Sequence, residues 1–220
     1  MKDKEISVEE ALNYVHEGDV IAIGGFLNNG TPFKLTQALA NSGIKNLTLI
    51  SNDTGFTDTE GIGKLVQNQQ FKRIITSHIG TNKETGRQMN ENITVVELTP
   101  QGTIAEKLRS GAFGLGGVLT PTGIGTSVAE GKDIIEVEGR QYLLEYPLKA
   151  DVAFVFADTA DKFGNLTYSG SENNFNHIMA ANAKTTIVEA RNVLDIGEID
   201  QNAVTTPGVY IDYVVSGGEA

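Results

Sequence analysis

The residues whose types and spacing best suit chemistry lie in two short stretches. The first, AIGGFLNNGTP (22–32), joins an apolar run to the expected start of a helix. Its paired glycines, Gly24 and Gly25, let the backbone approach a ligand closely. Free amides at a helix N-terminus then favour an anionic group, such as a phosphate, a carboxylate or an oxyanion. A tight turn that needs glycine only for its geometry explains the pattern equally well.

The second stretch, GSENNFN (170–176), places Glu172 between small polar residues and asparagines. A carboxylate in this setting is either a nucleophile for covalent catalysis or part of a polar turn ahead of a helix. Four other acids are expected at strand ends or in loops: Glu97, Glu130, Glu145 and Glu189. Acids in such places usually contact solvent or cap helices. Position along the chain therefore identifies no nucleophile.

Several familiar motifs are absent. The glycine stretch is neither G-x-G-x-x-G nor a P-loop, which disfavours those modes of nucleotide binding, and no G-x-S-x-G elbow is present. The histidines His16, His78 and His177 lack metal-ligand spacing, and there is no cysteine, so no metal site is expected. Of the three, His78 follows a strand-like run, where a ligand contact is topologically reasonable.

Apolar strand-like runs alternate with helical patterns along most of the chain. Strands are expected at 19–23, 46–51, 73–77, 93–98, 151–157, 184–190 and 208–215. Helices are expected from the capping box Ser7/Glu10 to Gly18, over 61–69, and from the capping box Thr103/Glu106 to about Arg109. A further helix is expected to end at Gly43 and to begin with Thr31 as its N-cap and Pro32 in its first turn. This alternation predicts an α/β fold, an open, mostly parallel sheet with helices on both faces.

One region departs from the alternation. Residues 111–126 are glycine-rich and too long for a simple connector. They carry the apolar residues Leu115, Val118, Leu119 and Ile124, so we expect a packed loop at a site or an interface. Residues 133–146 then alternate around Glu138-Gly139 and predict a β-hairpin. We interpret residues 1–220 as a single domain with a small β-rich insertion.

The composition limits the classes of partner. The chain has 220 residues, 40% of them hydrophobic, and a net charge of -11 from 17 basic and 28 acidic residues. Such acidity disfavours a nucleic-acid partner. Without an apolar leader or a run long enough to cross a bilayer, a soluble cytoplasmic protein without membrane contact is expected.

The stretch GDVIAIGGFLNNGTP (18–32) resembles the signature of family I coenzyme A transferases in their α-subunit form, in which an apolar strand leads into G-G-F, then x-x-x-G-x-P. Further segments resemble the family in its order, including SHIGTN, PQGTIAEKLRSGAFGLGGVLTPTGIGT, LLEYPLKADVAFV, NFNHIMAANAKTTIVEA and TPGVYIDYVV. The resemblance covers about 200 residues and is to the α subunits that serve acetate, acetoacetate and butyrate.

The resemblance implies a reaction and a partner. These enzymes move CoA between an acyl-CoA and a carboxylic acid through a glutamyl-CoA thioester, so an acyl-CoA and short-chain carboxylates are substrates and no permanent cofactor is needed. The nucleophilic glutamate belongs to a β subunit, in an assembly expected to be α2β2, and none is expected in this chain. The residues of this chain that match the family's motif are Gly24, Gly25, Phe26, Gly30 and Pro32. With the variable positions Leu27, Asn28 and Asn29, the loop from Gly24 to Gly30 is the expected CoA or substrate contact.

The resemblance also bears on Glu172. The β-subunit nucleophile lies in S-E-N-G, whereas Asn174 stands here in place of the glycine. The following NFN resembles an α-subunit segment that opens a helix, so Asn174 is expected to be the N-cap of that helix and Glu172 is not expected to be the nucleophile.

Two other functions remain open. One is a sugar-phosphate isomerase or deaminase of related fold, which would hold phosphate in the glycine loop. The other is a non-catalytic effector-binding domain on the same scaffold. Both would work without a second subunit, so co-purification of a partner discriminates between them and a transferase subunit.

Overall fold

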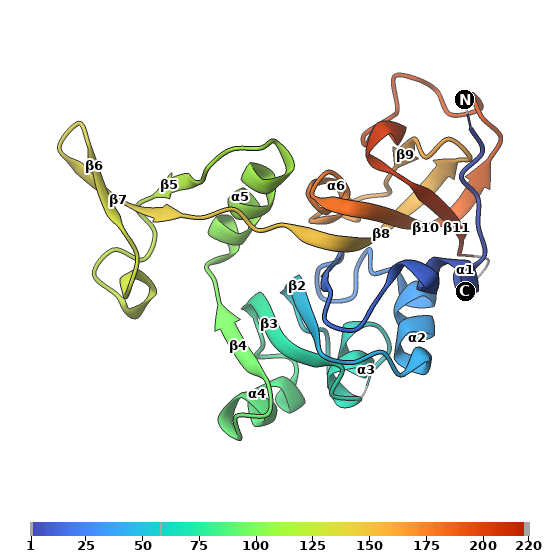
Figure 1. The fold of residues 1–220 in the computed structure, drawn as a ribbon. Coiled ribbons are helices and arrows are strands. Elements are labelled where there is room, and N and C mark those ends of the chain that lie inside the picture. Colours follow the sequence, from blue (N-terminus) through green and yellow to red (C-terminus); the bar gives the residue numbers. More distant parts are fainter. Residues whose placement is uncertain (1, 58, 218–220) are drawn as a thin grey trace.

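The computed structural model describes residues 2–57 and 59–217, and a large, mostly parallel sheet dominates it (Figure 1). Its strands are β1 (Val20–Ile23), β2 (Leu47–Asp53), β3 (Phe71–His78), β4 (Val95–Leu98), β8 (Ala150–Asp161), β9 (Leu166–Thr167), β10 (Ala183–Leu194) and β11 (Tyr213–Ser216). They are ordered β11-β10-β8-β1-β2-β3-β4, all pairs on this path are parallel, and β9 pairs antiparallel with β8. The predicted open, mostly parallel sheet is confirmed.

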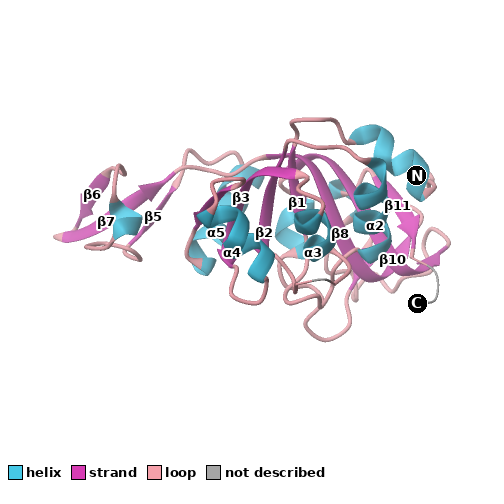
Figure 2. Ribbon diagram, turned by 90° about the horizontal axis from the view of Figure 1, so that it is seen from below, coloured by secondary structure: helices cyan, strands magenta, loops and turns pink. Residues whose placement is uncertain are grey.

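Helices cover both faces of this sheet, as predicted (Figure 2). They are α1 (Val8–Ala11), α2 (Phe33–Ser42), α3 (Ile62–Gln67), α4 (Lys83–Asn90), α5 (Gln101–Ala112) and α6 (Asn176–Ala180), with 3-10 turns at Leu12–Tyr14, Ser127–Ala129 and Gly208–Tyr210. Apolar side chains of α1, α2 and α3 form one core cluster with the sheet, and those of α5 and α6 form the other. Strands buried between two such layers read as the continuous apolar runs seen in the sequence.

The order in which the chain adds strands to the sheet reverses at β1. From β1 the chain adds β2, β3 and β4 on one side, whereas β8, β10 and β11 lie on the other. In open α/β sheets, ligands bind outside the carboxyl ends of the strands at such a switch point. The loop that follows β1, residues 24–32, lies there.

Some predicted element boundaries are wrong. The capping box Ser7/Glu10 forms, but α1 ends at Ala11 and gives way to a 3-10 turn. At the C-terminus, the expected strand at 208–215 is instead a 3-10 turn followed by β11, Tyr213–Ser216. Helix α4 was not expected because its polar sequence has no apolar period, and Asn82 caps it. No helix in residues 2–57 and 59–217 is long and apolar enough to cross a membrane.

The predicted capping box at Thr103 is also wrong. Helix α5 begins at Gln101 and runs to Ala112, so Thr103 lies within its first turn instead of before it. The Thr103 hydroxyl is buried and has no hydrogen-bond partner among the described residues. A buried hydroxyl without a partner loses its hydration and gains nothing in return.

Thr103→Val is therefore expected to raise the free energy of unfolding by about 1 kcal/mol, because it removes this hydroxyl at constant shape. Thr36→Val is the matched control, since the Thr36 hydroxyl is equally buried in α2 but donates to the Pro32 carbonyl at 2.9 Å. That variant should lose stability. Urea denaturation of both variants measures the two changes in the free energy of unfolding. Equal losses of stability would show that the Thr103 hydroxyl has a partner.

The predicted β-rich insertion is confirmed as a separate three-stranded sheet. Strands β5 (Val118–Thr120), β6 (Ile134–Val137) and β7 (Arg140–Glu145) form an antiparallel sheet in the order β5-β7-β6. Glu138 and Gly139 make the hairpin turn, with φ of 51° and 75°. Figures 1 and 2 both show this sheet projecting away from the main one. The expectation of a packed 111–126 loop is wrong for Leu115 and Leu119, which are 55% and 43% exposed.

Candidate functional site

The glycine loop after β1 is a tight hairpin with an unusual backbone. Phe26 and Asn29 exchange backbone hydrogen bonds of 3.0 and 2.9 Å, which leaves Leu27 and Asn28 at the tip. Both tip residues have positive φ, 47° and 67°, in the left-handed region that side chains rarely adopt. Such strain persists only where the surroundings fix it, and it is concentrated at functional sites.

A buried aspartate holds the tip of this loop. Asp53, the last residue of β2, accepts the Leu27 N–H at 2.9 Å and the Asn52 side-chain amide at 2.7 Å through Oδ2. Its Oδ1 accepts the Gly55 N–H at 2.8 Å. The Leu27 contact holds one of the two strained residues against the neighbouring strand. A hydrogen bond from a backbone N–H to a carboxylate is strong because the acceptor is charged.

A buried asparagine bonds to the end of the loop and packs against its start. Asn176, the first residue of α6, donates from Nδ2 to the Gly30 carbonyl at 2.9 Å and the Glu172 carbonyl at 2.7 Å. Its Oδ1 accepts the Phe156 N–H of β8 at 2.9 Å. A Cβ on Gly24 would lie 1.8 Å from this Oδ1, so the first glycine is required for space.

A third buried side chain fixes the helix that follows the loop. The expected Thr31 cap is wrong, since α2 begins at Phe33 and no neighbouring side chain caps it. Glu189 of β10 supplies the cap instead, and its Oε2 accepts the Leu35 N–H at 2.9 Å. Burial raises the pKa of Glu189 to about 7, although the Leu35 and Lys34 amides and the Lys34 charge lower it.

Glu189→Gln is expected to change how stability depends on pH. Because the folded pKa lies above the unfolded one, the folded protein holds a proton that the unfolded chain releases between pH 4.5 and 7. Stability is thus lost as pH rises through this window, by about 3 kcal/mol. Glutamine keeps an acceptor and does not titrate.

The measurement is the difference in unfolding free energy between Glu189→Gln and wild type at pH 5 and pH 8. This difference should grow in favour of the variant as pH rises, and the other carboxylates cancel in it. A difference that stays constant with pH would mean that Glu189 remains ionised in the folded protein.

The loop forms one wall of a cleft of ≈ 790 Å³. The cleft is lined by Asn28, Asn29, Gly30, Thr31, Phe33, Lys34, Phe156, Glu172, Glu189, Arg191, Asn192 and Gly217. Of the seven residues predicted to contact the substrate, Gly24 to Gly30, three line this cleft: Asn28, Asn29 and Gly30. The other four, Gly24 to Leu27, belong to the same hairpin but do not line the cleft.

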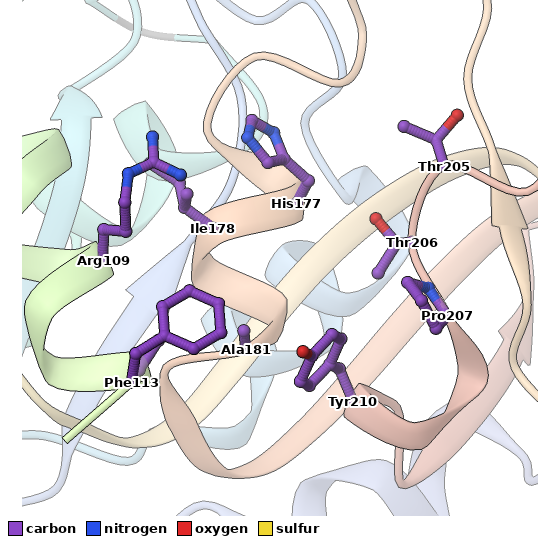
Figure 3. Close-up of a pocket in the computed structure, with 10 residues that line it drawn as sticks. Arg109, Phe113, His177, Ile178, Ala181, Thr205, Thr206, Pro207 and Tyr210 are labelled. Carbon is purple, nitrogen blue, oxygen red and sulfur yellow. The ribbon is translucent and has the colours of Figure 1, made fainter.

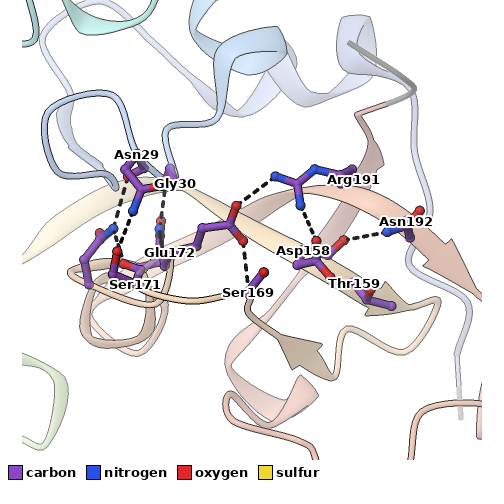
Figure 4. Close-up of polar contacts among 11 residues, drawn as sticks. Asn29, Gly30, Asp158, Thr159, Ser169, Ser171, Glu172, Arg191 and Asn192 are labelled. Atoms are coloured by element: carbon purple, nitrogen blue, oxygen red, sulfur yellow. Dashed lines mark hydrogen bonds and ion pairs between the residues drawn. The ribbon is translucent and has the colours of Figure 1, made fainter.

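Glu172 lies in the cleft wall with both carboxylate oxygens engaged (Figure 4). Oε1 pairs with Arg191 Nη2 at 2.8 Å, and Oε2 accepts the Ser169 N–H at 3.1 Å. Arg191 is shared with Asp158. A carboxylate tied to a guanidinium and a backbone amide is a weak nucleophile in this arrangement, because attack on a carbonyl would break these bonds.

The predicted capping role of Asn174 is wrong. Helix α6 begins at Asn176, Phe175 occupies the N-cap position, and no side chain caps it. Asn174 instead donates from Nδ2 to the carbonyls of Asn29 at 3.1 Å and Ser171 at 3.0 Å, while Asn29 Nδ2 donates to Ser171 Oγ at 2.9 Å. The NNFN segment therefore supports the glycine loop, which its spacing in sequence did not indicate.

The histidines lie apart from this site. His78 ends β3 with an exposed side chain, and His16 is also exposed beside Asp19. His177 borders a separate small cavity of ≈ 130 Å³ with Arg109, Phe113 and Tyr210 (Figure 3). Within residues 2–57 and 59–217, no three His, Asp or Glu side chains are grouped so as to hold a metal ion.

Known proteins resemble this chain along nearly its whole length. Residues 5–217 match the family model described as Coenzyme A transferase. The chain is 49% identical over 215 residues to the "Acetoacetyl-CoA:acetate/butyrate CoA transferase alpha subunit" of Clostridium acetobutylicum, covering 98% of both proteins. It is 46% identical over 220 residues to the "Acetate CoA-transferase subunit alpha" of Escherichia coli K12, covering 100% of both.

Solved structures show the same fold. An acyl-CoA transferase from Escherichia coli O157:H7 superposes with a TM-score of 0.87 at 22% identity, covering 98% of this chain and 47% of that one. This chain thus spans about half the length of that enzyme. Glutaconate coenzyme A-transferase from Acidaminococcus fermentans superposes with a TM-score of 0.86 at 22% identity, covering 98% and 76% of the two chains.

Proposed function

The chain belongs to the coenzyme A transferase family, and from this we propose that it is the α subunit of a short-chain acyl-CoA:carboxylate CoA-transferase of the acetate, butyrate and acetoacetate class. The observation that carries the proposal is the strained loop from Gly24 to Gly30, which the buried Asp53 and Asn176 hold beside the cleft at the sheet's switch point. Its full-length relatives with these activities support the substrate class.

The nucleophile of the reaction is a glutamate of a partner β subunit. It attacks the acyl-CoA carbonyl and CoA thiolate leaves, which gives an acyl-glutamyl anhydride. The thiolate then attacks the glutamyl carbonyl, releases the carboxylate and forms the glutamyl-CoA thioester. The incoming acid reverses these steps. Thioester is exchanged for thioester, so CoA enters as substrate, and no cofactor remains bound.

This chain contributes position and electrostatics. Asn28, Asn29 and Gly30 face the cleft. The Asn29 N–H is used within the hairpin, so the amides of Asn28 and Gly30, in a loop held by Asp53 and Asn176, are the donors that stabilise the oxyanion developing during acyl transfer. Glu172 keeps a structural role, which its bonds to Arg191 and Ser169 support. We place the assembly, as α2β2, in the cytoplasm.

The test is to incubate this chain with acetoacetyl-CoA, alone and with its co-expressed β subunit, and to read both subunits by intact mass and peptide mapping. A CoA adduct on a β-subunit glutamate, with activity only in the mixture and retained in Glu172→Gln, is the expected result. An adduct on Glu172 of the isolated chain would overturn the division of roles. A chain that binds a sugar phosphate and needs no partner would indicate the isomerase or effector-binding alternative.

A further inference from the structure

The projecting sheet has one apolar face that the described chain leaves largely exposed. We call residues 118–145, which hold β5, β6 and β7, the arm. The register places Leu119 opposite Leu144 and Ile135 opposite Tyr142, and Val137 lies opposite Arg140. Paired residues in an antiparallel sheet share a face. The apolar face of the arm is therefore Leu119, Ile135, Val137, Tyr142 and Leu144.

The two faces of the arm differ in what covers them. On the opposite face Leu143 is fully buried, because the loop around Gly123 and Val128 folds over it. On the apolar face Leu119, Ile135 and Val137 are 43%, 38% and 42% exposed. Ile134, on the same face as Leu143, is itself 50% exposed, so the chain covers only the part of that face around Leu143. A small sheet needs a hydrophobic face or a packing partner for stability, and the apolar face of the arm is left largely exposed.

Two ion pairs of one buried glutamate anchor the arm at its base. Glu145, buried at the end of β7, pairs with Lys107 of α5 at 3.2 Å and with Lys132 of the arm at 2.5 Å. A buried pair of this kind fixes geometry more than it adds stability. The apolar face is thus presented in one orientation, which lowers the entropic cost of docking.

The charges of the chain indicate which kind of partner fits the apolar face of the arm. Arg140 lies over the Tyr142 ring at 5.4 Å, at the tip of the apolar face, and makes no ion pair with any described residue. In a chain of net charge -11, an unpaired guanidinium beside apolar residues fits a surface with a carboxylate next to an apolar patch. A second copy would bring another net charge of -11 into contact, which repels.

We infer that the apolar face of the arm is the docking surface for the companion β subunit, which covers it with an apolar patch and pairs a carboxylate with Arg140. This rests on the proposed function, because that function supplies the companion. An obligate interface with an apolar centre and a charged rim has this composition.

Single cysteines test the inference directly, since the chain has none of its own. Val137→Cys points to the apolar face and Glu136→Cys, its neighbour in β6, to the other. The rate of maleimide labelling is measured for this chain alone and in the co-expressed complex. Complex formation should slow labelling of Val137→Cys at least about tenfold and that of Glu136→Cys less than about twofold.

An affinity measurement tests the inference independently. Ile135→Ser and the matched control Ile134→Ser change adjacent residues on opposite faces, both exposed in the free chain. Ile135→Ser should raise the Kd for the β subunit at least about tenfold, and Ile134→Ser should change it little. Equal labelling or equal Kd changes on the two faces would overturn the inference, as would a homodimer that Ile135→Ser alone dissociates.

Transferase activity is measured on the same samples and separates the two failures. An active complex in which Val137→Cys stays fully reactive refutes the docking surface and leaves the function standing. A complex that protects Val137→Cys but transfers no CoA refutes the function and leaves the docking surface standing.

Discussion

Asn176→Ala is expected to lower kcat/KM at least about 100-fold, because misplacing a reacting site by about 1 Å has an effect of this size. The side chain makes three buried hydrogen bonds, two of which hold the loop wall at Gly30 and Glu172. Removing it leaves one N–H and two carbonyls without their partner, and stability should fall by about 3–5 kcal/mol. Steady-state kinetics of the α–β complex and urea denaturation of this chain measure the two effects.

The chain offers a closely matched control in Asn182. This buried side chain also accepts one backbone N–H, from Ala150 at 3.1 Å, and donates to two carbonyls, those of Leu108 and Leu148, at 2.7 and 2.8 Å. Asn182→Ala should lose similar stability yet keep kcat/KM within about threefold, since none of its partners lies in the loop. Equal activity losses in the two variants would mean that Asn176 acts only through global stability.

Gly24→Ala is the second large effect. Gly24 has an ordinary φ, so alanine suits its backbone, but the added Cβ would lie 1.8 Å from Asn176 Oδ1 and 2.7 Å from its Cγ. Asn176 cannot yield without breaking its hydrogen bond to Phe156. We expect a loss of about 3 kcal/mol in stability, at the upper end for overpacking, and a fall in kcat/KM comparable to that of Asn176→Ala.

The matched control is Gly86→Ala in α4, where a Cβ meets nothing within 4 Å. It should raise stability by about 0.5–1 kcal/mol, because alanine favours helix. The double variant Gly24→Ala/Asn176→Ala locates the cause. With the asparagine shortened, the clash disappears, and the double variant should be more stable than the sum of the single losses by about 1–3 kcal/mol. If the stability losses of the two single variants simply add, the effect of Gly24→Ala does not come from a clash with Asn176.

Much of this protein followed from its sequence. The alternation of apolar runs and helical patterns predicted the parallel sheet and its two helical layers, because a strand buried on both faces leaves a continuous apolar signature. The alternation of residues 133–146 around Glu138-Gly139 predicted the hairpin, and glycine suits the left-handed backbone of the second turn position. The G-G-F stretch carried the family resemblance, which the full-length match confirms. These signals are local, and each can be read from a few neighbouring residues.

Only the tertiary structure decided what holds the loop. Asn176 lies 146 residues from Gly30, and Glu189 lies 154 residues from Leu35. No local periodicity reports such pairs, and each side chain has an unremarkable sequence context. The cap of α2 was sought in Thr31 for the same reason, because capping rules concern neighbours in sequence. The register of the arm likewise determined which of its side chains share a face, but only the packed chain showed that the apolar face stays largely exposed.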